Sequence, residues 1–331
     1  MNPFEFITAN KVICKIGAAQ ELGVYCAELG IKRLMLVTDA GIVQTGMAAP
    51  IVSAIEKAGI SVFMYSEIQA DPPEALVLSS VKIAKEESID GVVGLGGGSS
   101  MDVAKRIAVL AKSKQPLSEM YGIGNIRGDR LPLIQVSTTA GTGSEVTPTS
   151  IITTGETTKT GVISKQLLPD IAILDAELTV GLPPQVTAAT GIDAMVHAIE
   201  AYTSKHKKNV YSDMLAKQAL TLMSANLSEA VHNGSNLEAR SNMLLGAMMA
   251  GQAFANAPVA AVHALAYPLG GHYHIPHGLS NSLVLPHVLR FNAQAAAELY
   301  AELLPFVATG ETASGTAACD RFIAVMDGLI D

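Results

Sequence analysis

The chain has 331 residues, 49% of them hydrophobic and 16% charged, which suffices for one large or two ordinary globular domains and argues against disorder. Its formal net charge of -8, with no basic stretch longer than "KHKK", predicts neither a nucleic-acid nor an anionic-membrane partner. Three cysteines, Cys14, Cys26 and Cys319, show no CxxC spacing and no disulfide framework, so we expect reduced thiols and a cytoplasmic protein.

Short β-branched runs alternate with amphipathic stretches in the first half, a pattern typical of helices packed on a parallel sheet. The predicted strands cover residues 32–39, 59–68, 89–97 and 131–139, and the predicted helices include 48–59 and 74–88. After Pro183 and Pro184 only helical periodicity remains. We therefore predict an α/β domain over residues 1–184 and an all-helical domain over residues 185–331.

The stretch "GVVGLGGGSSMDVAKRIAVLA" (91–111) joins an apolar strand through glycines to a helix. Glycines let a backbone approach a pyrophosphate closely, and the free N–H groups of a helix N-terminus attract it. The alternative is a tight strand-to-helix turn without a ligand. Asp39, which ends an early strand, precedes these glycines, whereas the usual dinucleotide fingerprint places its acid after them. The layout would therefore differ from that fingerprint.

A second loop, "STTAGTGSEVTPTS" (137–150), also follows a predicted strand and supplies many hydroxyl groups. Taken alone, it could be a Ser/Thr-rich surface turn. Two such loops at the ends of neighbouring strands favour a dinucleotide that lies across the carboxyl edge of the sheet.

The stretch "GIDAMVHAIEAYTS" (191–204) places Asp193 and His197 four residues apart, on one face of a predicted helix. Five of the eight histidines lie in residues 260–287. His263 on an apolar face could be a buried core residue, but His277 is expected to return towards it after a turn. The helix-breaking residues expected between them are Pro268, Gly270, Gly271 and Pro276.

One carboxylate and three imidazoles would make a site for Fe(II) or Zn(II), formed by Asp193, His197, His263 and His277. Glu200, seven residues after Asp193, is interpreted as a supporting or structural residue and not as a base. Residues 244–267 are long and uncharged enough for a membrane span, but their polar residues, Pro258 and many small residues favour a helix inside a soluble bundle.

Five motifs in order resemble those of the iron-containing (group III) alcohol dehydrogenases, the family of lactaldehyde reductase and 1,3-propanediol dehydrogenase. They are "GGGSSMD" (96–102), "TTAGTGSEVT" (138–147), "LPDIAILD" (168–175), "GIDAMVHAIEAY" (191–202) and "HALAYPLGGHYHIPHG" (263–278). The resemblance implies a dehydroquinate synthase-like fold, the same four metal ligands, and hydride transfer between NAD(H) and a small primary alcohol or aldehyde. It also implies a homo-oligomer, expected to be a dimer.

The resemblance places Asp39 where the family's acid contacts the adenosine ribose, which indicates NAD in preference to NADP. Lys159 matches a lysine near the nicotinamide ribose. The full set of cofactor positions that it implies is Asp39, Gly96, Gly97, Gly98, Ser99, Asp102, Thr138, Thr139, Thr147 and Lys159.

Two departures from the family pattern bear on catalysis. Tyr267 stands where many members have a histidine suited to proton relay, so His272 or His274 could take that role. The chain also stops at "FIAVMDGLID", where further helices are expected, which predicts an incomplete, less stable helical domain and low activity.

Three alternatives remain open at this point. A truncated, weakly active or inactive metal- or nucleotide-binding remnant would fit the shortened end. A metal-free enzyme of the maleylacetate reductase type would lack the ligands. A sugar-phosphate lyase of the dehydroquinate synthase type would need more cationic residues around its pocket.

Overall fold

The computed structural model describes residues 3–155 and 158–330, which form two compact units. The sheet unit comprises Thr8–Thr139 and Ser144–Gly181, and the helical unit comprises Ala140–Gly143 with residues 3–7 and 182–330. The strands are β1 (Lys11–Cys14), β2 (Arg33–Asp39), β3 (Ser61–Ile68), β4 (Gly91–Gly96), β5 (Gly122–Ile123), β6 (Leu133–Ser137), β7 (Thr149–Thr154), β8 (Thr158–Ile163) and β9 (Ile171–Leu174). The α-helices are α1 (Leu22–Glu28), α2 (Ala40–Gln44), α3 (Ala48–Lys57), α4 (Glu74–Glu86), α5 (Gly98–Lys112), α6 (Pro184–Thr203), α7 (Val210–His232), α8 (Leu237–Asn256), α9 (Ala261–Tyr273), α10 (His277–Val307) and α11 (Gly315–Ile330).

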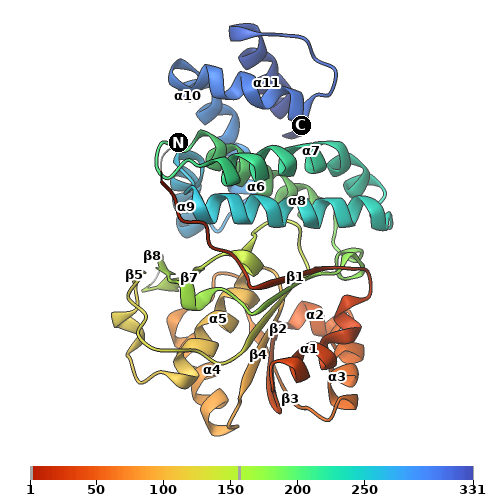
Figure 1. The fold of residues 1–331 in the computed structure, drawn as a ribbon, viewed down its shortest axis with the longest axis vertical. Helices are drawn as coiled ribbons and strands as arrows, with labels where there is room; N and C mark the ends of the chain where they lie inside the picture. The colour runs from red at the N-terminus through yellow and green to blue at the C-terminus, as the bar shows by residue number, and fades with distance from the viewer. Residues whose placement is uncertain (1–2, 156–157, 331) are drawn as a thin grey trace. The chain divides into compact units, whose positions relative to one another are not determined.

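The main sheet of the sheet unit is parallel, with the strand order β1-β9-β6-β4-β2-β3 (Figure 1). The chain moves outwards from β2 to β3 and then returns to the other side of β2 with β4. Such a reversal is a topological switch point, and ligands of open α/β sheets bind beyond the carboxyl ends of the strands there. A smaller sheet has the order β5-β8-β7.

Alternating side chains of the central strands face two separate cores, as expected for a sheet covered on both sides. Leu34 and Leu36 of β2 belong to a core built with α1 and α3, whereas Met35 and Val37 belong to a core built with α4 and α5. Figure 1 shows these two groups of helices on opposite faces of the sheet. The burial of β2 and β4 holds their carboxyl ends in place.

The helical unit is built from α6 to α11, and α6 is its central helix. Every residue of α6 from position 191 to 202 is buried, and a helix that is covered on all sides must contact several neighbours. It contacts α7, α8 and α10. Asn209 and Asn236 cap α7 and α8, because each side chain accepts hydrogen bonds from the first free backbone N–H groups of its helix.

The expected fold class, a parallel α/β unit followed by a helical unit, is confirmed, and the four predicted strands and two predicted helices form with slightly shorter ends. A strand that was not predicted, β1, precedes residues 32–39. β1 has four largely exposed residues at the sheet edge and therefore lacks a clear apolar pattern. The single boundary near residue 184 stays a prediction; the division into units changes at residues 181/182 but also assigns Ala140–Gly143 and residues 3–7 to the helical unit.

The predicted break between His263 and His277 lies later than expected. Pro268, Gly270 and Gly271 are inside α9, which ends at Tyr273, and the left-handed backbone of His274 (φ 56°) leads to Pro276 and α10. The turn before His277 is therefore present, but Pro268 does not make it. A proline removes only one helical hydrogen bond, so a helix held by its neighbours can accommodate it.

Residues 244–267, weighed above as a membrane span, belong to α8 and α9, which meet at an angle of 105°. In the described part of the chain, no single helix is long and apolar enough to cross a membrane; this bent pair passes by length and composition only.

The last two helices pack against each other, and the expected lower stability and activity of the helical domain stay predictions. The rings of Tyr300 on α10 and Phe322 on α11 stack with centroids 5.5 Å apart. The buried residues of this pair of helices include Tyr300, Leu303, Leu304, Phe322, Ile323 and Met326. These apolar faces thus cover one another.

Candidate functional site

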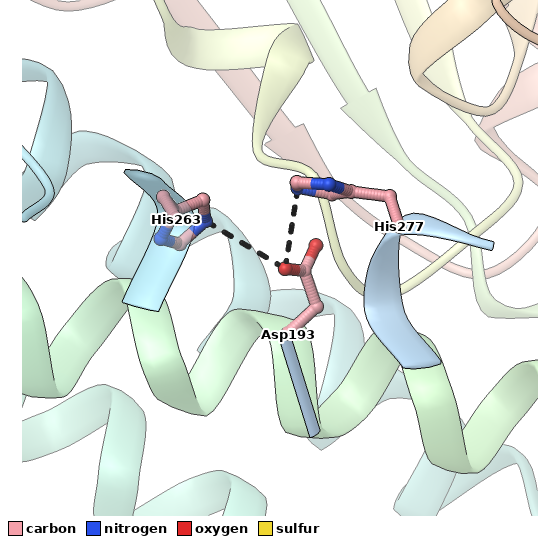
Figure 2. A group of neighbouring side chains, drawn as sticks. All are labelled: Asp193, His263 and His277. Carbon is pink, nitrogen blue, oxygen red and sulfur yellow. Dashed lines mark ion pairs between the residues drawn. The ribbon is translucent and has the colours of Figure 1, made fainter. Parts of the chain in front are cut away.

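Three side chains from three helices of the helical unit meet at one place. Asp193 lies on α6, His263 near the start of α9 and His277 at the first residue of α10 (Figure 2). Asp193 Oδ1 is 3.7 Å from His263 Nε2 and 3.6 Å from His277 Nε2. Ligands held tetrahedrally at about 2.0–2.2 Å from a metal lie about 3.3–3.6 Å apart, so these spacings fit a shared divalent cation.

Asn281 shows that the three ligand atoms converge. Its amide nitrogen donates to Asp193 Oδ1 and lies 3.3 Å from both His263 Nε2 and His277 Nε2. The amide nitrogen therefore lies within hydrogen-bond distance of all three ligand atoms, and Asn281 Oδ1 is buried without a hydrogen-bond partner among the described residues. Asn281 was not among the predicted site residues, although it follows His277 by the same four residues that separate Asp193 from His197.

Burial and neighbouring charge set the protonation of this group. Burial by itself raises the pKa of Asp193, but the imidazoles of His277, His197 and His263 and the hydrogen bond from Asn281 together lower that pKa below its usual value. Burial lowers the pKa of His197 to about 3. A deprotonated carboxylate is the form in which an aspartate binds a metal ion.

His197, the fourth predicted ligand, lies beside the group without joining it. Its ring stacks on His263, with centroids 4.6 Å apart, and on Phe254, with centroids 4.3 Å apart. Its Nδ1 is buried without a hydrogen-bond partner in the part of the chain that the structure describes. A buried, unpaired ring nitrogen at this position leaves His197 able to coordinate a metal ion.

The three proton-relay candidates differ in their surroundings. Tyr267 is half-buried on α9, and its ring stacks on His277 with centroids 5.9 Å apart. His272 and His274 are exposed near the end of α9, and neither belongs to the group around Asp193. The structure therefore places only Tyr267 next to a predicted ligand.

The predicted dinucleotide residues gather at the switch point of the sheet unit. Asp39 ends β2, Gly96 ends β4, and Thr138 follows β6; β4 pairs with both neighbours. A Cβ on Gly96 would lie 3.4 Å from Asp39 Oδ2, so the ends of β2 and β4 are close. Three predicted contacts from distant segments thus share one edge of the sheet.

The glycine loop has the shape that the phosphate hypothesis requires. Gly96 has a φ of +149°, which other residues rarely adopt, and a Cβ there would lie 2.8 Å from Ser100 Oγ. Gly97 is the N-cap of α5, and Gly98 and Ser99 begin its first turn. The Thr139 hydroxyl beside Gly97 is buried and has no hydrogen-bond partner among the described residues. These features fit an anion at the α5 N-terminus.

Asp102 holds the second predicted loop and has its oxygens engaged within the protein. Oδ1 accepts from the Ser144 hydroxyl at 2.7 Å, and Oδ2 accepts from the Ile151 N–H at 2.8 Å. The fully buried Lys105 donates to Thr149 O at 2.6 Å and to the Thr147 hydroxyl at 3.3 Å, and burial lowers the pKa of this lysine to about 8. The loop that carries Thr147 is thus anchored on α5.

Lys159, predicted near the nicotinamide ribose, lies on β8 of the smaller sheet. It forms an ion pair with Asp71 and donates to the Thr153 hydroxyl at 3.3 Å. Its ammonium group is therefore held by protein partners in this structure.

Comparison with known families gives two matches that together span most of the chain. The family model described as iron-containing alcohol dehydrogenase matches residues 9–176. The model described as Fe-containing alcohol dehydrogenase family, C-terminal, matches residues 187–329.

Comparisons with individual proteins agree with the family match. The chain is 43% identical to long-chain-alcohol dehydrogenase 1 of Geobacillus thermodenitrificans over 87% of this chain and 73% of that protein. It is 37% identical to the NAD-dependent methanol dehydrogenase of Bacillus methanolicus over 97% of this chain and 84% of that protein. A crystal structure of 1,3-propanediol oxidoreductase superposes with a TM-score of 0.95 at 37% identity, covering 99% of this chain and 86% of that one.

Proposed function

Because the chain belongs to the iron-containing alcohol dehydrogenase family, we propose that it transfers a hydride between NAD(H) and a small primary alcohol or its aldehyde. The observation that carries this proposal is the convergence of Asp193, His263 and His277 on the amide of Asn281. The relatives are named as dehydrogenases of long-chain alcohols, methanol and 1,3-propanediol, and these names support an alcohol substrate.

The proposed metal is Fe(II), with Zn(II) as the alternative, and the proposed ligands are Asp193, His197, His263 and His277. When bound, the cation makes an alcohol hydroxyl easier to deprotonate, and the nicotinamide accepts a hydride. Asp193 contributes the negative charge of the proposed ligand set, which attracts a cation. Tyr267, beside His277, is the proposed proton-relay residue, with His272 and His274 as weaker candidates because neither belongs to the group around Asp193.

The proposed cofactor is NAD, bound by the loops at the switch point of the sheet unit. The backbone at Gly97 and Gly98 offers N–H groups to a pyrophosphate, and the buried Thr139 hydroxyl offers a further polar contact. Asp39 offers acceptors to ribose hydroxyls. Lys159 remains a proposed contact near the nicotinamide ribose.

The remnant alternative is not favoured, because both family models match and α10 and α11 pack against each other. The family match also counts against a lyase and a metal-free reductase. A cytoplasmic location without nucleic-acid or membrane partners remains part of the proposal, supported by the net charge of -8 and three free cysteines. A homodimer also remains part of the proposal.

The direct test is reconstitution. The protein would be stripped of metal, reloaded anaerobically with Fe(II) or Zn(II), and mixed with NAD+ and a series of primary alcohols. We expect NADH to form only in the loaded protein. Metal-loaded protein that binds NAD+ but oxidises none of the alcohols would contradict the proposal.

Replacing Asp39 by Gly should shift cofactor preference towards NADP+. Asp39 Oδ1 accepts from the Ile42 N–H at 3.0 Å, while Oδ2 lies beside Gly96, where a carboxylate would repel a 2'-phosphate. We expect the NADP+/NAD+ ratio of kcat/KM to rise about tenfold, equivalent to about 1.4 kcal/mol. Asp129→Gly, at a highly exposed carboxylate, is the control. A wild-type protein that already prefers NADP+ would remove this role from Asp39.

Replacing Asp102 by Ala should weaken NAD(H) binding. The variant releases Ser144 and Ile151, so the loop that carries Thr147 loses its anchor. We expect the Kd for NADH to rise about tenfold, the equivalent of one lost hydrogen bond of about 1.4 kcal/mol. Fluorescence titration measures the Kd, and a melt reports folding. An unchanged Kd in a folded variant would show that the anchor is dispensable.

A further inference from the structure

Glu200 of α6 is a buried carboxylate whose three hydrogen-bond partners all lie at the start of another helix, α9. Its Oε1 accepts from the Val262 N–H at 2.7 Å, and its Oε2 accepts from the Ala260 N–H at 3.0 Å. Oε2 also lies 2.7 Å from His263 Nδ1. A single side chain therefore contacts the start of α9 and the imidazole that follows it.

The two backbone bonds fix how this carboxylate can interact with His263. A backbone N–H can only donate, so both oxygens of Glu200 must act as acceptors. An ionised carboxylate has no proton to give, so in the Oε2···Nδ1 contact the imidazole supplies the proton. His263 consequently carries its proton on Nδ1, and Nε2 is left with a free lone pair.

The opposite side of the ring agrees with this assignment. His263 Nε2 lies 3.3 Å from the amide nitrogen of Asn281, a donor, and 3.7 Å from Asp193 Oδ1. A bare Nε2 can accept from that amide. The lone pair of Nε2 therefore points towards the place where Asp193 and His277 also present theirs.

We propose that Glu200 is a positioning residue that holds His263 in its Nδ1–H form and so presents Nε2 to the metal. This inference rests on the proposed metal-dependent function. A carboxylate that accepts from the remote nitrogen of a metal-binding imidazole fixes the ring orientation and raises its basicity, and loss of such a partner weakens metal binding about 10- to 100-fold.

A role limited to capping α9 predicts a different outcome. α9 lacks a side-chain cap of its own, so the bonds to Ala260 and Val262 stabilise its first turn. If capping were the whole role, replacing Glu200 would lower stability and leave the tautomer of His263 unchanged. The tautomer of His263 is therefore the measurement that separates the two roles.

Glu200→Gln is the variant that tests the proposal with the least change in shape. A carboxamide has one oxygen, so it cannot accept from all three donors, and its NH2 group must face at least one of them. Glu302→Gln is the matched control in the same helical unit, because Glu302 accepts from the hydroxyl of Tyr202 and not from a histidine.

Two measurements on the full chain test whether Glu200 positions His263. The first is the Kd for Co(II), by chelator competition, for which we expect 10- to 100-fold weakening in Glu200→Gln and no change in Glu302→Gln. The second is 15N NMR of the metal-free protein labelled at histidine, with the His263 signals assigned by their loss in His263→Ala. We expect His263 to be protonated at Nδ1 only in wild type, and a population protonated at Nε2 to appear in Glu200→Gln.

Failure of this inference is distinguishable from failure of the proposed function. Wild-type protein that does not bind Co(II) would argue against the proposed function, whereas the tautomer of wild-type His263 can still be read. A proton on Nε2 in metal-free wild type overturns the role of Glu200. Equal Co(II) affinity of wild type and folded Glu200→Gln also overturns the role of Glu200. If that variant does not fold, the wild-type NMR result decides alone.

Discussion

Replacing His263 by Ala is expected to remove the metal and, with it, nearly all alcohol oxidation. Wild-type protein should hold about one metal ion per chain. The variant leaves Asp193 and His277 facing a gap, since His263 is buried and its Nε2 is one of the three converging ligand atoms. We expect kcat/KM to fall on the order of a thousandfold, because Lewis-acid stabilisation is worth several kcal/mol. Elemental analysis and NADH formation measure the two effects.

His232→Ala is the matched control for this variant. His232 is an exposed histidine of α7 in the same helical unit, and its Nδ1 lies 2.8 Å from the carbonyl of Ser228. Its replacement should leave metal content and turnover unchanged. Full metal content in folded His263→Ala would take His263 out of the proposed ligand set.

Sequence periodicity could place Asp193 and His197 on one helix face, but it could not decide what each side chain contacts. The structure turns Asp193 towards His263 and His277, whereas the ring of His197 stacks on His263 and Phe254. Both residues have the correct helical spacing, so the difference comes from side-chain rotamers and from the neighbours that pack around them. Spacing alone carries no information on either.

The long buried strands were predictable, but the short ones were not. β2 and β4 are apolar runs covered on both faces, so their composition alone indicates strands. β1 is short and largely exposed, so it lacks an apolar pattern. β7 and β8 are rich in threonine, and their sequences resemble the Ser/Thr-rich loop that precedes them. Their pairing depends on partners far away in the sequence.

The contacts of Glu200 were outside the reach of sequence patterns for a similar reason. No spacing rule links residue 200 to the backbone of Ala260 and Val262, since that contact depends on how α6 and α9 pack. The sequence does show an acid close to the face of Asp193, which suggested a supporting role. Only the three hydrogen bonds indicate which ligand it supports.

Replacing Gly278 by Ala is expected to damage both stability and metal binding through one backbone contact. A Cβ at this second residue of α10 would lie 2.4 Å from the carbonyl oxygen of Ala189 and 2.7 Å from its carbonyl carbon. Backbone atoms cannot rotate away, so α10 must move off α6. Overpacking of this kind costs up to about 3 kcal/mol, and we expect a loss near that value in urea unfolding.

The same displacement should act on the metal group, because Gly278 follows His277 directly and Ala189 lies one helical turn before Asp193. His277 would then move away from Asp193, and the metal Kd should rise even where the variant is fully folded. Gly270→Ala on α9 is the control: its Cβ would meet only Ile275 O at 3.6 Å, and an alanine within a helix is favoured by about 0.5–1 kcal/mol. Equal metal affinity in folded Gly278→Ala and Gly270→Ala would show that the spacing of α6 and α10 does not control the site.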